Sequence, residues 1–194
     1  MSKPSLRKKA KRASTYRSRT LVCVVENPKF LTNLMGIVRT AEALGVGKVC
    51  VIDDGKLNLP KDWQDMRDNP RFLSLSASGI KWLYVKKFSS TSECLEYLAK
   101  KNYTNVGTSS HQFGKKNLDL SEGKYTQHHL AVWFGNEVKG LSQDALKACD
   151  FCIQIPMYGI IESMNLSSSA SIVLNHIVEK RQEFHKRKIS KKSH

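Results

Sequence analysis

The sequence has 194 residues, enough for one domain with a hydrophobic core, and with 40% hydrophobic and 25% charged residues it reads as globular and soluble. No window approaches the roughly 18–20 apolar residues that a membrane span needs, so we expect no membrane partner. The net charge of +15 instead indicates a polyanionic partner such as nucleic acid.

From Thr20 onward, short apolar runs alternate with amphipathic stretches. The runs predict strands over Leu21–Glu26, Val49–Asp53, Trp82–Val85, Asn105–Thr108, Leu130–Phe134 and Phe151–Ile155. Helices are predicted over Leu31–Leu44, Thr91–Lys101, Gln143–Ala148 and Ser168–Arg187, and the polar run Trp63–Ser78 stays unassigned. This alternation is typical of an α/β fold with a mostly parallel sheet covered by helices on both faces. Ligands of such sheets bind beyond the carboxyl ends of the strands.

The first polar cluster follows the first predicted strand and contains Asn33 and Arg39, six residues apart. On a helix this spacing is a rotation of about 240°, so the two side chains do not share a face. Both can serve one site only if Asn33 lies at or before the start of the helix. By spacing alone, a helix-capping Asn and a surface Arg are the favoured alternative.

The second cluster follows Phe134 and places Glu137 between Gly135 and Gly140. Glycines allow a backbone to approach a ligand closely, and the carboxylate can orient a substrate or a partner arginine. Alone, the same residues are also compatible with a plain turn.

The third cluster follows Ile155 and leads into the long last helix, with Ser163, Met164 and Asn165 just before it. The amino end of a helix can receive a negative group, although Ser163 and Asn165 are also ordinary capping residues. Neither a Gly-x-Gly-x-x-Gly nor a Gly-x-x-x-x-Gly-Lys-Ser/Thr pattern is present. Dinucleotide oxidoreductases, ordinary Rossmann-type methyltransferases and P-loop nucleotidases therefore lose their main sequence support.

The positive charge lies at the two ends of the chain. Residues 1–19 contain eight Lys or Arg and no acid, residues 180–194 contain seven against Glu183, and only +1 remains between them. We divide the chain into a basic arm (1–19), a globular domain (20–180) and a basic tail (181–194). Such ends bind phosphates in a salt-dependent way. The alternatives are disordered ends that only aid solubility and, less favoured, membrane-surface binding or an organelle transit peptide at the acid-free start.

The five cysteines are odd in number and lack the spacing of a disulfide framework. Cys149 and Cys152 form a Cys-x-x-Cys pair, but zinc needs four ligands and no second pair exists. We therefore expect no metal and reduced thiols in a cytoplasmic protein.

Taken together and in this order, the three clusters resemble the motifs of the SpoU family, the TrmH-like branch of the SPOUT RNA methyltransferases. The resemblance covers roughly residues 20–180. It rests on Asn33…Arg39-Thr-Ala, on Phe-Gly-Asn-Glu137-x-x-Gly140-Leu-Ser, and on Ile155-Pro-Met-x-Gly159-x-x-x-Ser163-Met164-Asn165-Leu-Ser. The first motif departs from the family at Met35, where many members have Gly or Ser.

The resemblance implies a C-terminal deep trefoil knot, an exception to the rule against threaded chains. It also implies S-adenosylmethionine bound in the knotted loops, and a homodimer whose active site draws on both protomers. By matching positions, the backbone around Thr108, Gly135, Ile155 and Met164 would bind this cofactor. Arg39 would be the catalytic arginine, supported by Asn33, Glu137, Ser163 and Asn165.

The implied reaction is transfer of a methyl group to a ribose 2′-hydroxyl of RNA, and it needs no metal. An arginine, with a pKa of about 12.5 or more, is a poor general base, so Arg39 makes better sense as a clamp on a neighbouring phosphate. The short chain looks most like the tRNA guanosine-2′-O-methyltransferases, with the basic ends binding RNA. Ribosomal RNA is the alternative substrate, and a non-catalytic RNA-binding relative with the same knot is the alternative of another class.

Overall fold

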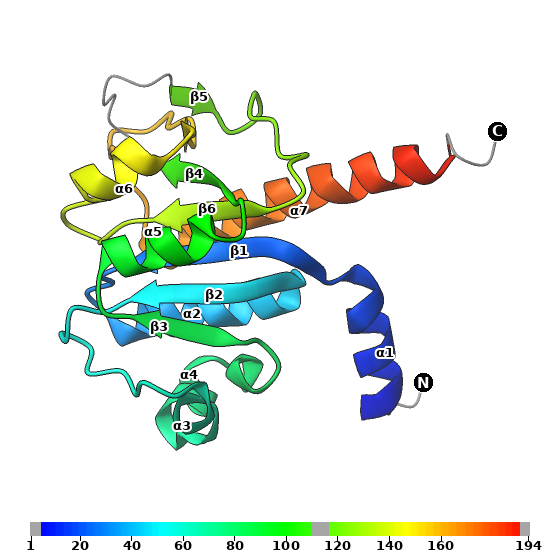
Figure 1. Ribbon diagram of the computed structural model, residues 1–194, viewed down its shortest axis with the longest axis vertical. Coiled ribbons are helices and arrows are strands. Elements are labelled where there is room, and N and C mark those ends of the chain that lie inside the picture. Colours follow the sequence, from blue (N-terminus) through cyan, green and yellow to red (C-terminus); the bar gives the residue numbers. More distant parts are fainter. Residues whose placement is uncertain (1–4, 110–116, 191–194) are drawn as a thin grey trace.

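Seven parallel strands form a single sheet in the order β3-β2-β1-β6-β4-β7-β5 (Figure 1). The structure is a computed structural model that describes residues 5–109 and 117–190. The strands are β1 (Ser18–Glu26), β2 (Val46–Ile52), β3 (Val85–Phe88), β4 (Thr104–Thr108), β5 (Asn117–Asp119), β6 (Leu130–Phe134) and β7 (Phe151–Gln154). The predicted α/β class with a mostly parallel sheet is confirmed.

Helices cover both faces of this sheet (Figure 1). On one face α2 (Leu31–Ala43) and α7 (Leu166–Ser190) pack against the strands, and α5 (Thr91–Ala99) and α6 (Gln143–Ala148) cover the other. The connection from β2 to β3 contains α3 (Trp63–Asp68), α4 (Pro70–Leu75) and the short 3₁₀ helix η1 (Gly79–Lys81). The polar run without a predicted element therefore holds two short helices, of which α4 starts at Pro70 with Asn69 as its N-cap.

The hydrophobic core lies in two layers because successive strand residues point to opposite faces. In β1, Leu21, Cys23 and Val25 belong to the layer under α2 and α7, whereas Val22 and Val24 belong to the layer under α5 and α6. All five are fully buried, as expected for a continuous apolar run in a parallel sheet.

Two sequence-based predictions of strands need correction. The strand predicted at Trp82–Val85 is instead β3, which begins only at Val85. The carbonyl of Leu83 accepts a hydrogen bond from Nε1 of Trp63, so this apolar residue is buried in the η1–β3 connection and not in a strand. The three-residue edge strand β5 was missed, because its half-buried residues form no apolar run.

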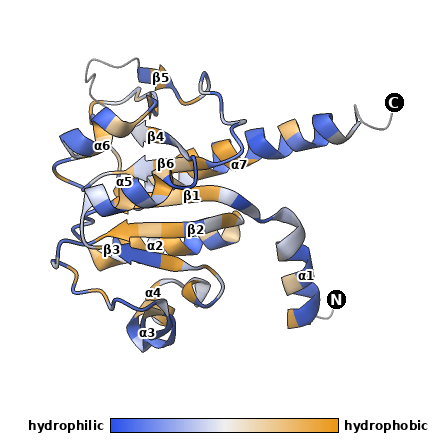
Figure 2. Cartoon of the chain, viewed as in Figure 1, coloured by the Kyte–Doolittle hydropathy of each residue, from blue (hydrophilic) through white to orange (hydrophobic). Residues whose placement is uncertain are grey.

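The basic ends of the chain differ in how they are attached. Helix α1 (Leu6–Tyr16) has no buried residue, and α1 and the last turns of α7 lie on the side of the sheet where the strands begin (Figures 1 and 2). Residues 1–4 and 191–194 of the predicted arm and tail lie outside the described residues. Helix α7 continues through the boundary placed at residue 180. No helix in the described part of the chain is both long and apolar enough to cross a membrane.

Arg181 is one basic residue of the predicted tail that does not face solvent. It is 5% exposed, and its guanidinium donates to the carbonyls of Tyr125, Gln127 and His128 and to the hydroxyls of Ser18 and Thr20. These bonds attach α7 to the start of β1 and to the segment before β6, so Arg181 stabilises the fold and is not available to RNA.

Candidate active site

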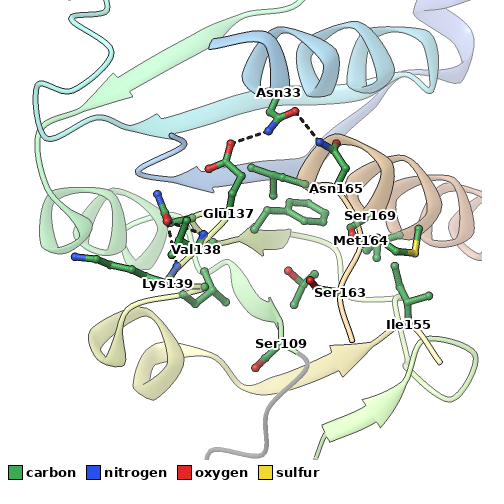
Figure 3. A pocket seen from close by; sticks show the side chains of 18 of the residues that line it. Asn33, Ser109, Glu137, Val138, Lys139, Ile155, Ser163, Met164, Asn165 and Ser169 are labelled. Carbon is green, nitrogen blue, oxygen red and sulfur yellow. Dashed lines mark hydrogen bonds between the residues drawn. The ribbon is translucent and has the colours of Figure 1, made fainter. Parts of the chain in front are cut away.

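A cavity of about 760 Å³ opens at the carboxyl ends of the strands, as expected for an open parallel sheet (Figure 3). Eight of the nine predicted site residues line it: Asn33, Thr108, Gly135, Glu137, Ile155, Ser163, Met164 and Asn165. They come from α2, from the last residue of β4 and from the segments after β6 and β7, which are distant in sequence and share one edge of the sheet.

A chain of hydrogen bonds joins the three motifs inside this cavity (Figure 3). Nδ2 of Asn33 donates to Oε1 of Glu137 over 2.8 Å, and Nδ2 of Asn165 donates to Oδ1 of Asn33 over 3.1 Å. Oδ1 of Asn165 accepts from the backbone N–H groups of Ser167 and Ser168 at the start of α7. Because a carboxylate only accepts and a backbone N–H only donates, these two ends fix the orientation of both amides.

Glu137 is the charged end of this chain. Its carboxylate also accepts from the backbone N–H groups of Lys29 (2.6 Å) and Phe30 (3.3 Å). Desolvation by burial raises the pKa of Glu137, but the hydrogen bonds from Asn33 and the backbone outweigh it and hold the pKa below its ordinary value. Glu137 is therefore ionised at neutral pH and acts as an acceptor.

The loop that carries Glu137 is closed by its own backbone. Asn136 and Gly140 exchange two backbone hydrogen bonds, and Oδ1 of Asn136 accepts from the N–H groups of Val138 and Lys139. A Cβ at Gly135 would overlap the backbone of Gly140, so glycine is required here by the closure of the loop itself. The interpretation of this motif as a turn is thus confirmed, and the same turn places Glu137 at the wall of the cavity.

A second set of contacts, not predicted from the sequence, joins this loop to the end of β1. Glu26 is 2% exposed, and its carboxylate accepts from the backbone N–H and the hydroxyl of Ser142 and from the hydroxyl of Thr91. Nδ2 of Asn136 donates to the carbonyl of Asn27 over 2.6 Å. The only sequence feature that points to this role is a carboxylate at the end of an otherwise apolar strand.

Arg39 is the one predicted site residue that does not line the cavity. Asn33 is the third residue of α2, so both residues lie within the helix and their side chains point about 120° apart. Arg39 is exposed, and its Cα lies beside Gly79 of η1. One protomer therefore does not bring Arg39 and Asn33 to the same site.

The model of the SpoU rRNA methylase family matches residues 20–175, most of the chain. The chain belongs to the SpoU rRNA methylase family. The family predicted from the three motifs is thus confirmed.

Curated relatives of this SpoU protein have related names. A tRNA (guanosine(18)-2′-O)-methyltransferase of Thermus thermophilus is 29% identical over 154 residues, which cover 79% of this chain and 72% of the relative. A protein of the same name from Borreliella burgdorferi is 31% identical over 159 residues, which cover 81% of this chain and 66% of the relative.

Solved structures of SpoU proteins share the fold. The Aquifex aeolicus TrmH/SpoU tRNA modifying enzyme has a TM-score of 0.76 at 24% identity, covering 93% of this chain and 86% of that one. The SpoU methyltransferase AviRb of Streptomyces viridochromogenes, in complex with S-adenosylmethionine, has a TM-score of 0.68 at 24% identity. The match covers 86% of this chain and 59% of AviRb.

Proposed function

We propose that this SpoU protein is an RNA methyltransferase that moves a methyl group from S-adenosylmethionine to a ribose 2′-hydroxyl, with tRNA as substrate and a homodimer as the active form. The observation that carries this proposal is the hydrogen-bonded chain Glu137–Asn33–Asn165 in a cavity at the carboxyl edge of the sheet. It joins three motifs that are far apart in sequence.

The residues of the cavity fit the cofactor. A volume of about 760 Å³ lies within the range of about 300–1,000 Å³ that small-molecule sites occupy. Leu141, Ile155, Met157 and Met164 provide an apolar wall, and the backbone segments after β6 and β7 provide donors and acceptors. When bound there, S-adenosylmethionine supplies an electrophilic methyl group on a sulfonium, so that no metal is required.

Asn33 and Asn165 are suited to hold the ribose. Each amide nitrogen has two N–H groups, and the chain of hydrogen bonds uses one of them. The remaining N–H groups can donate to oxygens of the nucleotide. Because Glu137 and the start of α7 fix both amides, Asn33 and Asn165 would hold the ribose in one orientation, with its 2′-hydroxyl toward the methyl donor.

The dimer supplies the arginine. Arg39 points away from the cavity of its own protomer, so it contributes only if a second copy brings its α2 to that cavity. Exposed apolar side chains beside the cavity, Val138, Tyr158, Ile160 and Ile161, support such a contact. As a planar bidentate donor, Arg39 of one protomer stabilises negative charge at the phosphate and 2′-oxygen bound to the other.

Two further features belong to this proposal. The strand order, in which β4 lies between the later strands β6 and β7, supports a C-terminal part tied in a deep trefoil knot. We place the protein in the cytoplasm, where thiols such as those of its five buried cysteines stay reduced. The names of the relatives favour tRNA over ribosomal RNA.

The direct test is mapping of 2′-O-methylated riboses in total RNA from cells with and without the protein, and in tRNA treated with purified protein and cofactor. We expect one or a few tRNA positions to gain methylation. Arg39→Ala serves as the inactive protein, and Arg71→Ala, at an exposed arginine of α4, serves as its matched control. Methylation confined to ribosomal RNA would make that RNA the substrate. Absence of both methylation and cofactor binding would leave a non-catalytic RNA-binding protein.

A further inference from the structure

Three lysines surround the ring of Tyr97 on the face of the sheet covered by α5. Their Nζ atoms lie 4.2 Å (Lys86), 5.2 Å (Lys48) and 5.5 Å (Lys101) from the ring centroid. Nζ of Lys48 also donates to the hydroxyl of Tyr97 over 2.6 Å. We call Lys48, Lys86 and Lys101 the lysine cluster.

The sheet brings these lysines together. Lys86 of β3 is in register with Cys50, which lies two residues after Lys48 in β2, so both lysines point to the same face. Lys101 lies just after α5, and α5 runs back to the side on which the strands begin. Lys48 and Lys86 therefore lie in the amino-terminal halves of β2 and β3, and none of the three lysines lines the cavity.

No carboxylate of the described residues forms an ion pair with the lysine cluster. Of the two glutamates on α5, Glu93 accepts from the backbone N–H of Ser89, and Glu96 is exposed. Tyr97 contacts Lys86 with its ring and Lys48 with its hydroxyl, but it brings no net charge to offset the mutual repulsion of the ammonium groups. Burial lowers the pKa of Lys48, but the hydrogen bond to Tyr97 and the charge interactions with Tyr97, Cys50 and Tyr103 together raise it above its ordinary value, so Lys48 is charged at neutral pH. Three neighbouring ammonium groups of this kind favour the binding of an anion.

The residues around the lysine cluster indicate that this anion is a nucleic acid, which carries both phosphates and bases. Tyr84, next to the cluster, is 44% exposed, and Nζ of Lys48 lies 5.7 Å from its ring centroid. Exposed aromatic rings among lysines are typical of surfaces that stack bases while binding the backbone. The basic helix α1 and the exposed end of α7 lie on the same side of the sheet (Figure 1).

We propose that the lysine cluster binds backbone phosphates of the RNA substrate, with Tyr84 contacting an unpaired base. The inference rests on the proposed function, because it takes RNA as the partner. It adds a second contact surface outside the cavity: Lys48 lies four residues before Ile52, the last residue of β2, or about 13 Å at roughly 3.3 Å per residue. An RNA that contacts both surfaces extends from the carboxyl edge of the sheet along the face covered by α5.

The test compares RNA binding by three double variants over a series of salt concentrations, with unmodified tRNA as the probe. Lys86→Gln with Lys101→Gln removes two charges from the cluster. Lys56→Gln with Lys124→Gln removes two charges from lysines outside it, and Lys86→Arg with Lys101→Arg keeps the charge. We expect the cluster variant alone to bind on the order of tenfold more weakly, with a slope of log K against log salt flatter by roughly 0.7–0.9 per lost phosphate contact. Tyr84→Leu is expected to weaken binding with an unchanged slope, because stacking releases no counterions.

Equal affinity and slope for the cluster variant and its matched control would overturn the proposal. A loss of thermal stability without a loss of RNA affinity would also overturn it, since the cluster would then only stabilise the fold. Binding of inorganic phosphate but not tRNA at the cluster would have the same consequence. Cofactor binding and methylation are measured separately on the wild-type protein, so failure of the proposed function is distinguishable from failure of this inference.

Discussion

Nδ2 of Asn33 donates a 2.8 Å hydrogen bond to Oε1 of Glu137, 104 residues further along the chain. The bond connects the start of α2 to the loop after β6. Backbone N–H groups of Lys29 and Phe30 hold the same carboxylate, so it is fixed before any ligand arrives. The amide of Asn33 is consequently preorganised, and ligand binding need not order it.

Replacing Glu137 by Gln is expected to lower the rate of methylation by roughly one to two orders of magnitude. Hydrogen bonds to a charged group contribute about 1.5–3 kcal/mol, and an amide in this position offers one acceptor where the carboxylate offers two. Calorimetry should find cofactor affinity nearly unchanged. Glu162→Gln, at another carboxylate that lines the cavity, is the matched control. A normal rate in Glu137→Gln would contradict the role given to this carboxylate.

The same variant predicts a pH dependence of stability. Because the folded-state pKa of Glu137 lies below its ordinary value, its ionised form stabilises the native state above the unfolded pKa, about 4.3. This contribution is lost as the pH falls through the folded pKa. The difference in melting temperature between wild type and Glu137→Gln should therefore be constant near neutral pH and shrink below about pH 4.3. A difference that persists undiminished at pH 3 would exclude this linkage.

The proposed dimer makes Arg39 testable by complementation. Arg39→Ala alone should abolish turnover and leave cofactor affinity unchanged, and Arg39→Lys should rescue little because it lacks the planar fork. Co-refolding Arg39→Ala with Glu137→Gln should restore about a quarter of wild-type activity, because random pairing makes half the dimers mixed, each with one intact site. If a mixture is no more active than its components, each protomer uses its own arginine.

Glu26 should be important for stability, not for chemistry. Glu26→Ala leaves the backbone N–H of Ser142 and two hydroxyls without their acceptor, so we expect a loss of about 3 kcal/mol in the free energy of unfolding. Thr91→Val removes only one of the three donors and should cost less. Urea unfolding of the two variants measures the difference, and equal values would show that Glu26 is solvated when its partners are lost.

The basic N-terminal arm should act on RNA affinity alone. Removal of residues 1–15 deletes six Lys or Arg and, within the described residues 5–15, none that is buried, whereas Arg17 donates to the carbonyl of Trp82 and must stay. We expect an unchanged melting temperature and a slope of log K against log salt flatter by roughly 0.7–0.9 for each phosphate released. An unchanged slope would mean that the arm does not contact RNA.

The sequence predicts those parts of the fold that depend on local pattern. Apolar runs located five of the seven strands, because strands buried on both faces are continuous in hydrophobicity. β5 has no such pattern and is defined only by its backbone pairing with β7. The prediction for β3 was displaced because Leu83 has the apolar character of a strand residue but accepts a hydrogen bond from a tryptophan side chain, which only the tertiary structure reveals.

The sequence predicts which side chains of the motifs line the cavity. It does not predict the backbone groups that hold these side chains in place. Asn33, Glu137 and Asn165 come together because carboxyl ends of parallel strands share one edge. The backbone N–H groups that bind Glu137 cannot be recognised from residue type, because every residue except proline has a backbone N–H group. Arg181 looked like part of a charged tail because its acceptors are mostly carbonyls, which the sequence does not display.

The position of β4 constrains the order in which the sheet can assemble on the ribosome. β1, β2 and β3 neighbour one another and are made first, so they can pair while synthesis continues. β4 lies between β6 and β7, and both are made after it. The backbone N–H and C=O groups of β4 therefore stay unpaired until the last third of the chain has been made. A ribosome stalled once β4 has left the exit tunnel, with β6 and β7 still inside it, should carry a folded three-strand unit followed by a protease-sensitive stretch.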